Sequence, residues 1–377
     1  SQNVILAGGG NDQIMGGAGN DVIDGGDGID ELDYFDSATG INVDLGNDTA
    51  ADGLGGTDTI VNVEDVHGSE FDDVITGDGA ANVLDGESGN DTLAGAGGAD
   101  KLLGGEGNDV IGGGDGNDFI DGGWGADTLI GGVGNDQIDG GGDVDTVDFS
   151  GATAAINVDL VAGTASDGLG GTDGLVNVEN IVGSNLDDAI TGDGSNNLLV
   201  GDGGNDVLAG GGGNDALDGG SGDDVLAGGA GDDVLDGGDG LDIVSYADAT
   251  GAVTVSLDSG APQAVGGGEG SDTFVNIEGV TGSAFGDTLS GGGGNDVIDG
   301  GGGNDAIDGG GGTDTADFAS ALGAVTVDLT AGTADEAVQP AVVQLDDLDG
   351  SDGFVIGGSY SYGVHSVSGI GDINGDG

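Results

Sequence analysis

The stretch GGAGNDVID GGDGIDELD, Gly16 to Asp33, consists of two nine-residue units laid end to end. Each unit has a glycine pair, a third glycine, an aspartate at position six and an aliphatic residue at position eight. Units of the form G-G-x-G-x-D-x-U-x, where U is apolar, fill four uninterrupted blocks, 7–33, 68–148, 183–245 and 282–317. This strict period argues against disorder, which composition alone would favour, and predicts a chain built from stacked repeats.

The composition excludes several classes of partner. The chain has 377 residues, of which 95 are glycine and 72 are acidic, and its single basic residue, Lys101, leaves a net charge of −71. The Lys/Arg clusters that nucleic acids and anionic membranes require are missing, and no apolar run reaches the roughly 18 residues of a membrane span. We therefore expect no nucleic-acid partner and no direct membrane insertion. Because cysteine is absent, neither disulfides nor thiolate metal sites hold the fold, and a bound cation is the expected stabiliser.

Three spacers of related sequence, 34–67, 149–182 and 246–281, separate the blocks, and 318–341 resembles the start of a fourth that caps the last block. Each full spacer carries the alternating stretch INVDL, INVDL or VTVSL and then TDTIVNVE, TDGLVNVE or SDTFVNIE. Period-two alternation predicts strands with one buried face. We expect the spacers to be modified coils of the same solenoid. The aromatic residues that open them are expected to plug the core, a binding face being the alternative: Tyr34, Phe149, Tyr246 and Phe318.

The nonapeptide has a direct physical interpretation. Glycine accepts positive φ, which costs other residues about 1–2 kcal/mol, so six glycine-rich residues can form a tight turn. Three residues remain for a short strand whose position-eight side chain points into a thin aliphatic core. Each turn presents backbone carbonyls and one carboxylate, an all-oxygen set that suits calcium, with its roughly six to eight oxygen ligands, better than magnesium or zinc.

The repeat resembles the RTX (repeats-in-toxin) calcium-binding β-roll family, in which two nonapeptides make one coil and calcium lies between successive turns. The resemblance covers most of 1–337 and implies an all-β, parallel β-roll or β-solenoid. Its first block spans 1–33, because residues 1–6 match the end of a further unit before the complete units of 7–33. It also implies up to about 15 Ca²⁺ ions, whose ligands are Asp12, Asp21, Asp30, Asp91, Asp100, Asp109, Asp118, Asp127, Asp136, Asp145, Asp206, Asp215, Asp224, Asp233, Asp242, Asp296, Asp305 and Asp314. Asn82 and Asn197 replace the position-six aspartate, and weaker or absent cation binding is expected there.

Residues 342–377 have a different pattern. The stretches LDGSDGFVIGG (348–358) and GVHSVSGIGDINGDG (363–377) are similar to the start of an FG-GAP repeat, the blade unit of integrin-type β-propellers. This resemblance implies a partial propeller blade after the solenoid, with calcium ligands at Asp372, Asn374 and Asp376. An EF-hand is the weaker alternative for DINGDG, because no helical pattern precedes it.

The RTX resemblance implies a bacterial protein that is secreted by a type I system and is extracellular or at the cell surface. The chain starts in the middle of a repeat, so we expect the natural protein to extend upstream. His67 and His365 lack motif partners and no G-x-S-x-G occurs, so no enzyme activity is expected.

The expected function is structural. The chain would be a stalk, surface-layer or adhesin segment that folds and stiffens on binding extracellular calcium, with self-association or cell-surface and matrix partners. One alternative is the repeat or secretion region of a type I-secreted enzyme or toxin whose catalytic domain lies outside this stretch. A calcium store is the third interpretation.

Overall fold

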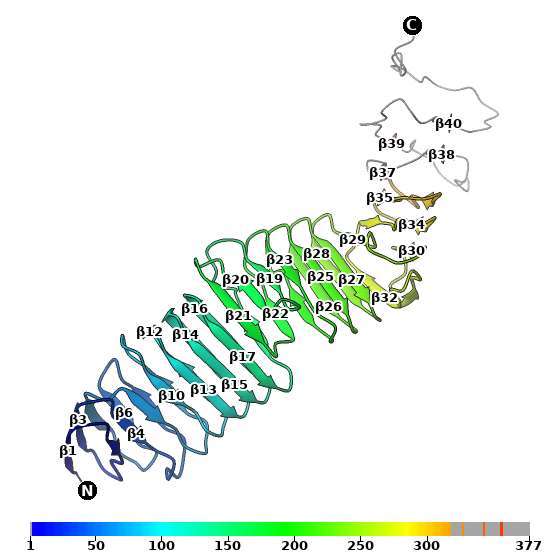
Figure 1. Ribbon diagram of the computed structural model, residues 1–377. Helices are drawn as coiled ribbons and strands as arrows, with labels where there is room; N and C mark the ends of the chain where they lie inside the picture. The colour runs from blue at the N-terminus through cyan, green and yellow to red at the C-terminus, as the bar shows by residue number, and fades with distance from the viewer. Residues whose placement is uncertain (1, 318–325, 328–341, 344–354, 357–377) are drawn as a thin grey trace. The chain divides into compact units, whose positions relative to one another are not determined.

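The computed structural model describes residues 2–317, 326–327, 342–343 and 355–356 (Figure 1). These residues form β-strands and turns without a helix, so none of them belongs to a helix able to cross a membrane. The chain divides into two compact units, Ser1–Val207 and Leu208–Gly377. Of the expected propeller segment 342–377 only 342–343 and 355–356 are described, and Asp372, Asn374 and Asp376 lie outside the described residues.

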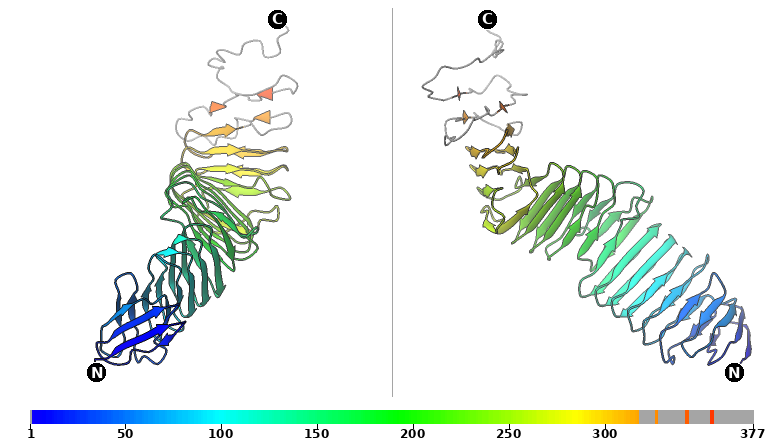
Figure 2. Two further views of the ribbon diagram at one scale, coloured as in Figure 1. Left: turned by 60° about the vertical axis from the view of Figure 1, so that its left-hand side comes forward. Right: turned by 180° about the vertical axis from the view of Figure 1, so that it is seen from behind.

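In the first unit two nonapeptides make one coil. Strand β1 (Val4–Gly9) pairs in parallel with β3 (Val22–Asp27), with Val4 opposite Val22. Strand β2 (Gln13–Ile14) pairs in the same way with β4 (Glu31–Asp33). Successive units therefore alternate between two parallel sheets, and Figures 1 and 2 show the resulting stack of strands.

The strands of the first unit fall into these two sheets. The first sheet continues with β5 (Asn42–Asp44), β6 (Thr49–Ala51), β7 (Asp58–Val61), β9 (Val74–Thr76), β11 (Thr92–Ala94), β12 (Gly97–Gly98), β14 (Val110–Gly116), β16 (Thr128–Val133), β18 (Thr146–Asp148), β22 (Asn180–Val182) and β24 (Leu198–Val200). The second sheet continues with β8 (Asp65–His67), β10 (Val83–Asp85), β13 (Lys101–Glu106), β15 (Phe119–Trp124), β17 (Gln137–Gly142), β19 (Asn157–Asp159), β20 (Thr164–Ser166), β21 (Thr172–Val176) and β23 (Ala189–Thr191).

The spacers stay within the ladder but introduce an antiparallel strand. In the first spacer β7 pairs in parallel with β3, β5 pairs in parallel with β9, and β6 lies antiparallel between β5 and β7. The strands at INVDL and TDTIVNVE confirm the prediction from alternation, whereas β6 was not predicted. The fold is therefore a parallel solenoid with local antiparallel insertions.

The second spacer repeats this arrangement in the opposite sheet, where β20 lies antiparallel between β19 and β21. The number of nonapeptides between the two spacers explains this change of sheet. Nine nonapeptides separate the two spacers, and each nonapeptide moves the chain from one sheet to the other. An odd number of units therefore places the antiparallel strand of the second spacer in the sheet opposite to that of β6.

The second unit has the same local architecture. Strand β25 (Val207–Gly212) begins at the division, and one sheet then contains β26 (Ala216–Ser221), β28 (Val234–Asp239) and β32 (Ser271–Val275), with β31 (Gln263–Ala264) antiparallel to β32. The remaining strands are β27 (Val225–Ala230), β29 (Ile243–Ser245), β30 (Thr254–Ser256), β33 (Gly279–Thr281), β34 (Thr288–Ser290), β35 (Val297–Asp299), β36 (Ala306–Asp308), β37 (Thr315–Asp317), β38 (Thr326–Val327), β39 (Val342–Val343) and β40 (Val355–Ile356).

The core is narrow and consists mainly of aliphatic side chains that the two sheets contribute in turn. The position-eight residue is buried in each unit from Ile14 to Ile298, and Ile307 and Ala316 in the last two units are half-buried. The aromatic residues that open the three full spacers are also buried, as expected for core plugs: Tyr34, Phe149 and Tyr246. Phe318 lies outside the described residues. With one such side chain per half-coil, the core alone contributes little stability for the length of chain that it orders.

Candidate calcium sites

The position-six aspartates form two rows, one along each line of turns. The Oδ1 atom of Asp109 accepts the main-chain N–H of Asp91 at 2.7 Å, and the N–H of Asp109 is donated to Asp127 Oδ1 at 2.8 Å. In the other row the N–H of Asp100 is donated to Asp118 Oδ1 at 2.8 Å. Each Oδ1 therefore ties its coil to the preceding one.

The second carboxylate oxygen of these residues is buried without a hydrogen-bond partner. This holds for the Oδ2 atoms of Asp12, Asp21, Asp30, Asp91, Asp100, Asp109, Asp118, Asp127, Asp136, Asp145, Asp233 and Asp242. Asp109, for example, is only 1% exposed. A buried carboxylate oxygen without a partner is costly unless a cation balances it.

Backbone carbonyls border these free oxygens. A Cβ placed on Gly104 would collide with both Asp109 Oδ2 and the Gly122 carbonyl oxygen of the next coil. Glycine is required here because the two oxygens face a space that a side chain would fill. The donors are oxygen only, which fits calcium and provides none of the nitrogen or sulfur ligands that zinc prefers.

Electrostatics in the rows disfavours the ionised carboxylates when no cation is present. Burial raises the pKa of Asp109 to about 6, and the charge of Asp127 one coil further on raises it as well. Burial likewise raises the pKa of Asp91 to about 7 against the opposing hydrogen bond from the Asp73 N–H. A divalent cation between such carboxylates would remove both penalties.

The remaining predicted ligands differ in burial and in the hydrogen bonds that their carboxylate oxygens accept. Asp206, Asp215 and Asp224 are buried in the same rows. Asp296 is buried as well, but its Oδ2 accepts the N–H of Gly292 at 2.7 Å. Asp305 and Asp314, near the end of the last block, are only half-buried.

Three position-six aspartates lie in the first unit of their blocks, and their carboxylate oxygens accept hydrogen bonds from groups of the same unit. Ser69 donates its N–H to Asp73 Oδ2 at 2.6 Å and its hydroxyl to Asp73 Oδ1 at 2.7 Å. The same serine contacts recur at Asp188 and Asp287. These three residues were not among the predicted ligands. Serine in place of the second glycine is the sequence signal that distinguishes them.

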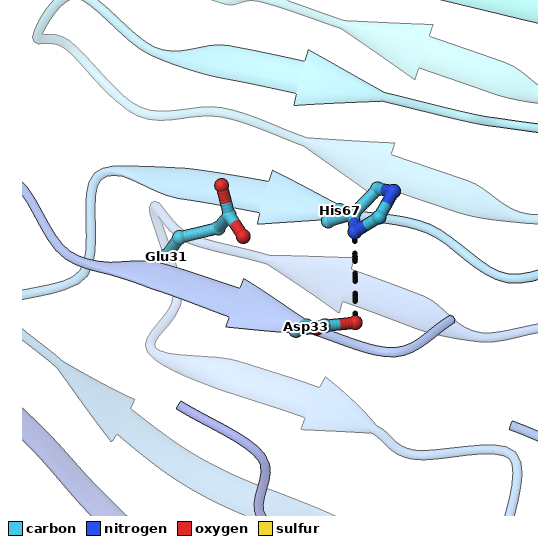
Figure 3. Close-up of side chains that lie close together, drawn as sticks. All are labelled: Glu31, Asp33 and His67. Carbon is cyan, nitrogen blue, oxygen red and sulfur yellow. Dashed lines mark ion pairs between the residues drawn. The ribbon is translucent and has the colours of Figure 1, made fainter. Parts of the chain in front are cut away.

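A separate group of titratable side chains surrounds His67 on the outer face of the second sheet (Figure 3). Its Nδ1 lies 3.5 Å from Asp33 Oδ1, and its Nε2 lies 2.6 Å from Glu87 Oε1. Donor atoms of Glu31, Asp33 and His67 all lie within 4.8 Å of one another, a spacing that a metal ion could bridge. The sequence pattern gave no partner for His67 because these residues come from neighbouring coils.

The charge state of His67 favours an ion pair over a metal site. Burial lowers the pKa of His67, but the hydrogen bond to Glu87 and the charges of Glu87, Asp85 and Asp33 outweigh it and raise the pKa overall. A raised pKa favours the imidazolium form, which has no free lone pair for a metal. In a chain with a single Lys or Arg, a protonated His67 would be a rare internal counter-charge.

A β-solenoid whose turns carry rows of buried, oxygen-only donors defines the class of calcium-binding β-roll proteins. The family profile of the RTX calcium-binding nonapeptide repeat (4 copies) matches residues 2–32, 63–93, 94–129, 121–151, 182–217, 218–247 and 281–316. The chain belongs to this family, whose repeats bind calcium and are typical of proteins secreted by type I systems. Among curated proteins, none matches the chain.

Proposed function

We propose that this chain is a secreted structural segment, such as a stalk, surface-layer or adhesin segment, whose solenoid folds and stiffens on binding extracellular calcium. The observation that carries the proposal is the row of buried carboxylates whose Oδ2 atoms have no partner. The ligands in this proposal are the position-six aspartates other than Asp73, Asp188 and Asp287, and up to about 15 ions could be held between successive coils.

The physical basis is coupling between folding and binding. The chain holds 72 acidic side chains and one basic side chain, so its own residues cannot neutralise the stacked carboxylates. In the absence of calcium each added coil brings like charges together around a thin core. Calcium reverses the sign of this interaction, and its binding free energy becomes folding free energy. The protein would then stay unfolded where calcium is scarce and fold after export.

A non-catalytic role is part of the proposal. The buried polar side chains of residues 2–317 are aspartates, asparagines and serines of the turns. These residues are engaged in turn hydrogen bonds or face the proposed ions. The long array of repeats supports a mechanical role, since solenoid stability grows coil by coil through nearest-neighbour contacts.

The test combines folding with mechanics. Far-ultraviolet circular dichroism would follow the chain from chelator to about 10 mM calcium, above the roughly 10⁻⁴–10⁻³ M range of extracellular modules, with magnesium as control. We expect a cooperative gain of β signal with calcium alone. Single-molecule pulling should then show force-resistant unfolding only in calcium. A β-rich, force-resistant chain in chelator would overturn the proposal.

A further inference from the structure

Each spacer ends in a turn of three residues that leads to its last strand. Only residues 62–64 lie between β7 and β8, and they have the sequence NVE. The turns 177–179, between β21 and β22, and 276–278, between β32 and β33, read NVE and NIE. A nonapeptide turn has six residues and ends on an aspartate. The spacer turn is therefore half as long and ends on a glutamate.

The glutamate of each turn stands in the place of the next aspartate of a row. Asp30 donates its N–H to Glu64 Oε2 at 2.9 Å. In a regular row an aspartate Oδ1 one coil further on accepts this N–H, as Asp127 does from Asp109 at 2.8 Å. The same bond to a glutamate recurs in the other two spacers, from Asp145 to Glu179 at 3.0 Å and from Asp242 to Glu278 at 3.2 Å.

Further hydrogen bonds hold the short turn against the coil before it. The carbonyl oxygen of Asp30 accepts the N–H groups of Glu64 and Asp65, both at 3.0 Å. Asn62 adopts the left-handed conformation, with φ 51°, which asparagine tolerates better than most residues. Its Nδ2 donates to Asp24 Oδ1 at 2.7 Å. Equivalent conformations and side-chain bonds occur at Asn177 and Asn276.

The aspartate that faces each glutamate has an Oδ2 without a hydrogen-bond partner among the described residues. These three aspartates are 0% exposed: Asp30, Asp145 and Asp242. A Cβ on Gly25 would collide with both Asp30 Oδ2 and the carbonyl oxygen of Asn62. Gly104 has the corresponding neighbours in a regular row, where the carbonyl belongs to a glycine of the next coil. The same two oxygens border Gly140, namely Asp145 Oδ2 and the Asn177 carbonyl oxygen.

In the turn that follows each glutamate, a hydrogen bond takes the place that a cation has in the rows. Asn82 donates its Nδ2 to the Glu64 carbonyl oxygen at 2.7 Å, and Asn197 makes the equivalent bond after the second spacer. After the third spacer, Asp296 Oδ2 accepts the N–H of Gly292 at 2.7 Å. The rows of unpartnered Oδ2 atoms on these lines of turns are therefore interrupted at each glutamate.

We propose that three further calcium ions are bound at the ends of the blocks, each between a last nonapeptide turn and a spacer turn, with the spacer glutamates as ligands: Glu64, Glu179 and Glu278. This inference rests on the proposed function, in which the oxygen rows bind calcium. The glutamate supplies the second carboxylate and the asparagine main chain supplies the carbonyl. The oxygen donors at a block end are thus of the same kind as those between two nonapeptide turns.

These ions would make the docking of each spacer depend on calcium. A spacer turn without a carboxylate would leave the buried Oδ2 of the preceding aspartate unbalanced, which is costly. With the glutamate, the ion joins the spacer to the block, and its binding free energy stabilises both.

The test counts bound calcium by equilibrium dialysis. The triple variant Glu64→Gln/Glu179→Gln/Glu278→Gln removes three charges, whereas glutamine keeps an oxygen that can accept the aspartate N–H. We expect three fewer ions, or three ions whose affinity is at least about tenfold lower, because calcium affinity depends on ligand charge. A control variant removes three exposed charges and should keep the full number of ions: Glu70→Gln/Glu106→Gln/Asp115→Asn.

The outcomes separate this inference from the proposed function. A wild-type chain that binds no calcium would overturn both. If the triple variant binds as many ions as the wild type with unchanged affinity, the glutamates are only hydrogen-bond acceptors and the block-end ions alone are overturned. An equal loss of ions in the control variant would overturn them as well, because total charge would then be the cause.

Circular dichroism in about 10 mM calcium checks that each variant folds. If the triple variant does not fold, Glu179→Gln alone repeats the test. It should lose one ion, and hydrogen exchange should show that calcium-dependent protection falls around Asp145 and stays unchanged around Asp30. Protection that stays unchanged at both aspartates would overturn the inference.

Discussion

The side-chain Nδ2 of Asn82 donates a hydrogen bond to the main-chain carbonyl oxygen of Glu64 at 2.7 Å. Asn197 makes the same bond to the carbonyl of Glu179, also at 2.7 Å. Both asparagines stand at position six in the second unit of a block. The side-chain amide at this position donates a hydrogen bond to the backbone carbonyl. An aspartate at the same position would instead place its own Oδ2 against that carbonyl oxygen. A hydrogen bond thus takes the place of one carboxylate charge at both positions, and the weaker cation binding expected there stays a prediction.

Replacing Asn82 by Asp should exchange this hydrogen bond for a calcium requirement. In chelator the new carboxylate would face the Glu64 carbonyl, and we expect a loss of about 1–3 kcal/mol in unfolding free energy. In calcium the variant should bind one additional ion. Urea unfolding in chelator and binding stoichiometry in calcium measure the two effects. An unchanged stoichiometry would show that this coil lacks the other oxygen ligands.

Asp118→Asn in the longest block should act locally. Asparagine keeps the Oδ1 acceptor for the Asp100 N–H but removes the charge of the unpartnered Oδ2. We expect loss of calcium at the adjoining coils and a more stable calcium-free form, because one source of like-charge repulsion is gone. Hydrogen exchange resolved along the chain checks both expectations, with the exposed Asp115→Asn as the matched control. Equal changes in all four blocks would contradict nearest-neighbour behaviour.

Acid should partly replace calcium in stabilising the fold. Burial raises the pKa of Asp91 and of Asp173 to about 7, above the unfolded value of about 4. A carboxyl whose folded pKa is raised contributes its stability below the unfolded pKa and loses it as the pH rises through the folded pKa. In chelator, the β signal and the urea midpoint should therefore be higher at pH 5 than at pH 7.5. A midpoint that rises with pH would show that the buried carboxylates are not the cause of calcium-free instability.

Ser69→Ala should weaken the fold without changing calcium binding. The variant removes the Ser69 hydroxyl bond to Asp73 Oδ1 but keeps the N–H bond to Oδ2. The expected cost is about 1–2 kcal/mol of unfolding free energy in calcium. Isothermal titration should give the wild-type number of ions, whereas a lost ion would mean that Asp73 is itself a ligand.

The nonapeptide pattern alone was sufficient to predict the repeating part of the fold. Glycine turns of fixed spacing and one aliphatic residue per unit determine a short strand, its inward face and the residue whose carboxylate lies in the turn. Residues such as Ile111 and Asp109 could be placed correctly because each coil repeats the environment of the last. The same reasoning does not extend to 342–377, where the repeat ends and where the calcium ligands expected from the propeller resemblance lie outside the described residues.

What only the tertiary structure decided depends on contacts between segments far apart in the chain. The ion pair of His67 with Glu87 and the hydrogen bond from the Asp136 N–H to Asp173 Oδ1 each join residues from different coils. Their partners are set by how many residues a spacer inserts and by which sheet it enters. The nonapeptide pattern describes one coil at a time, so it determines the repeated environment, whereas the geometry where that repetition breaks follows from the stacking of coils.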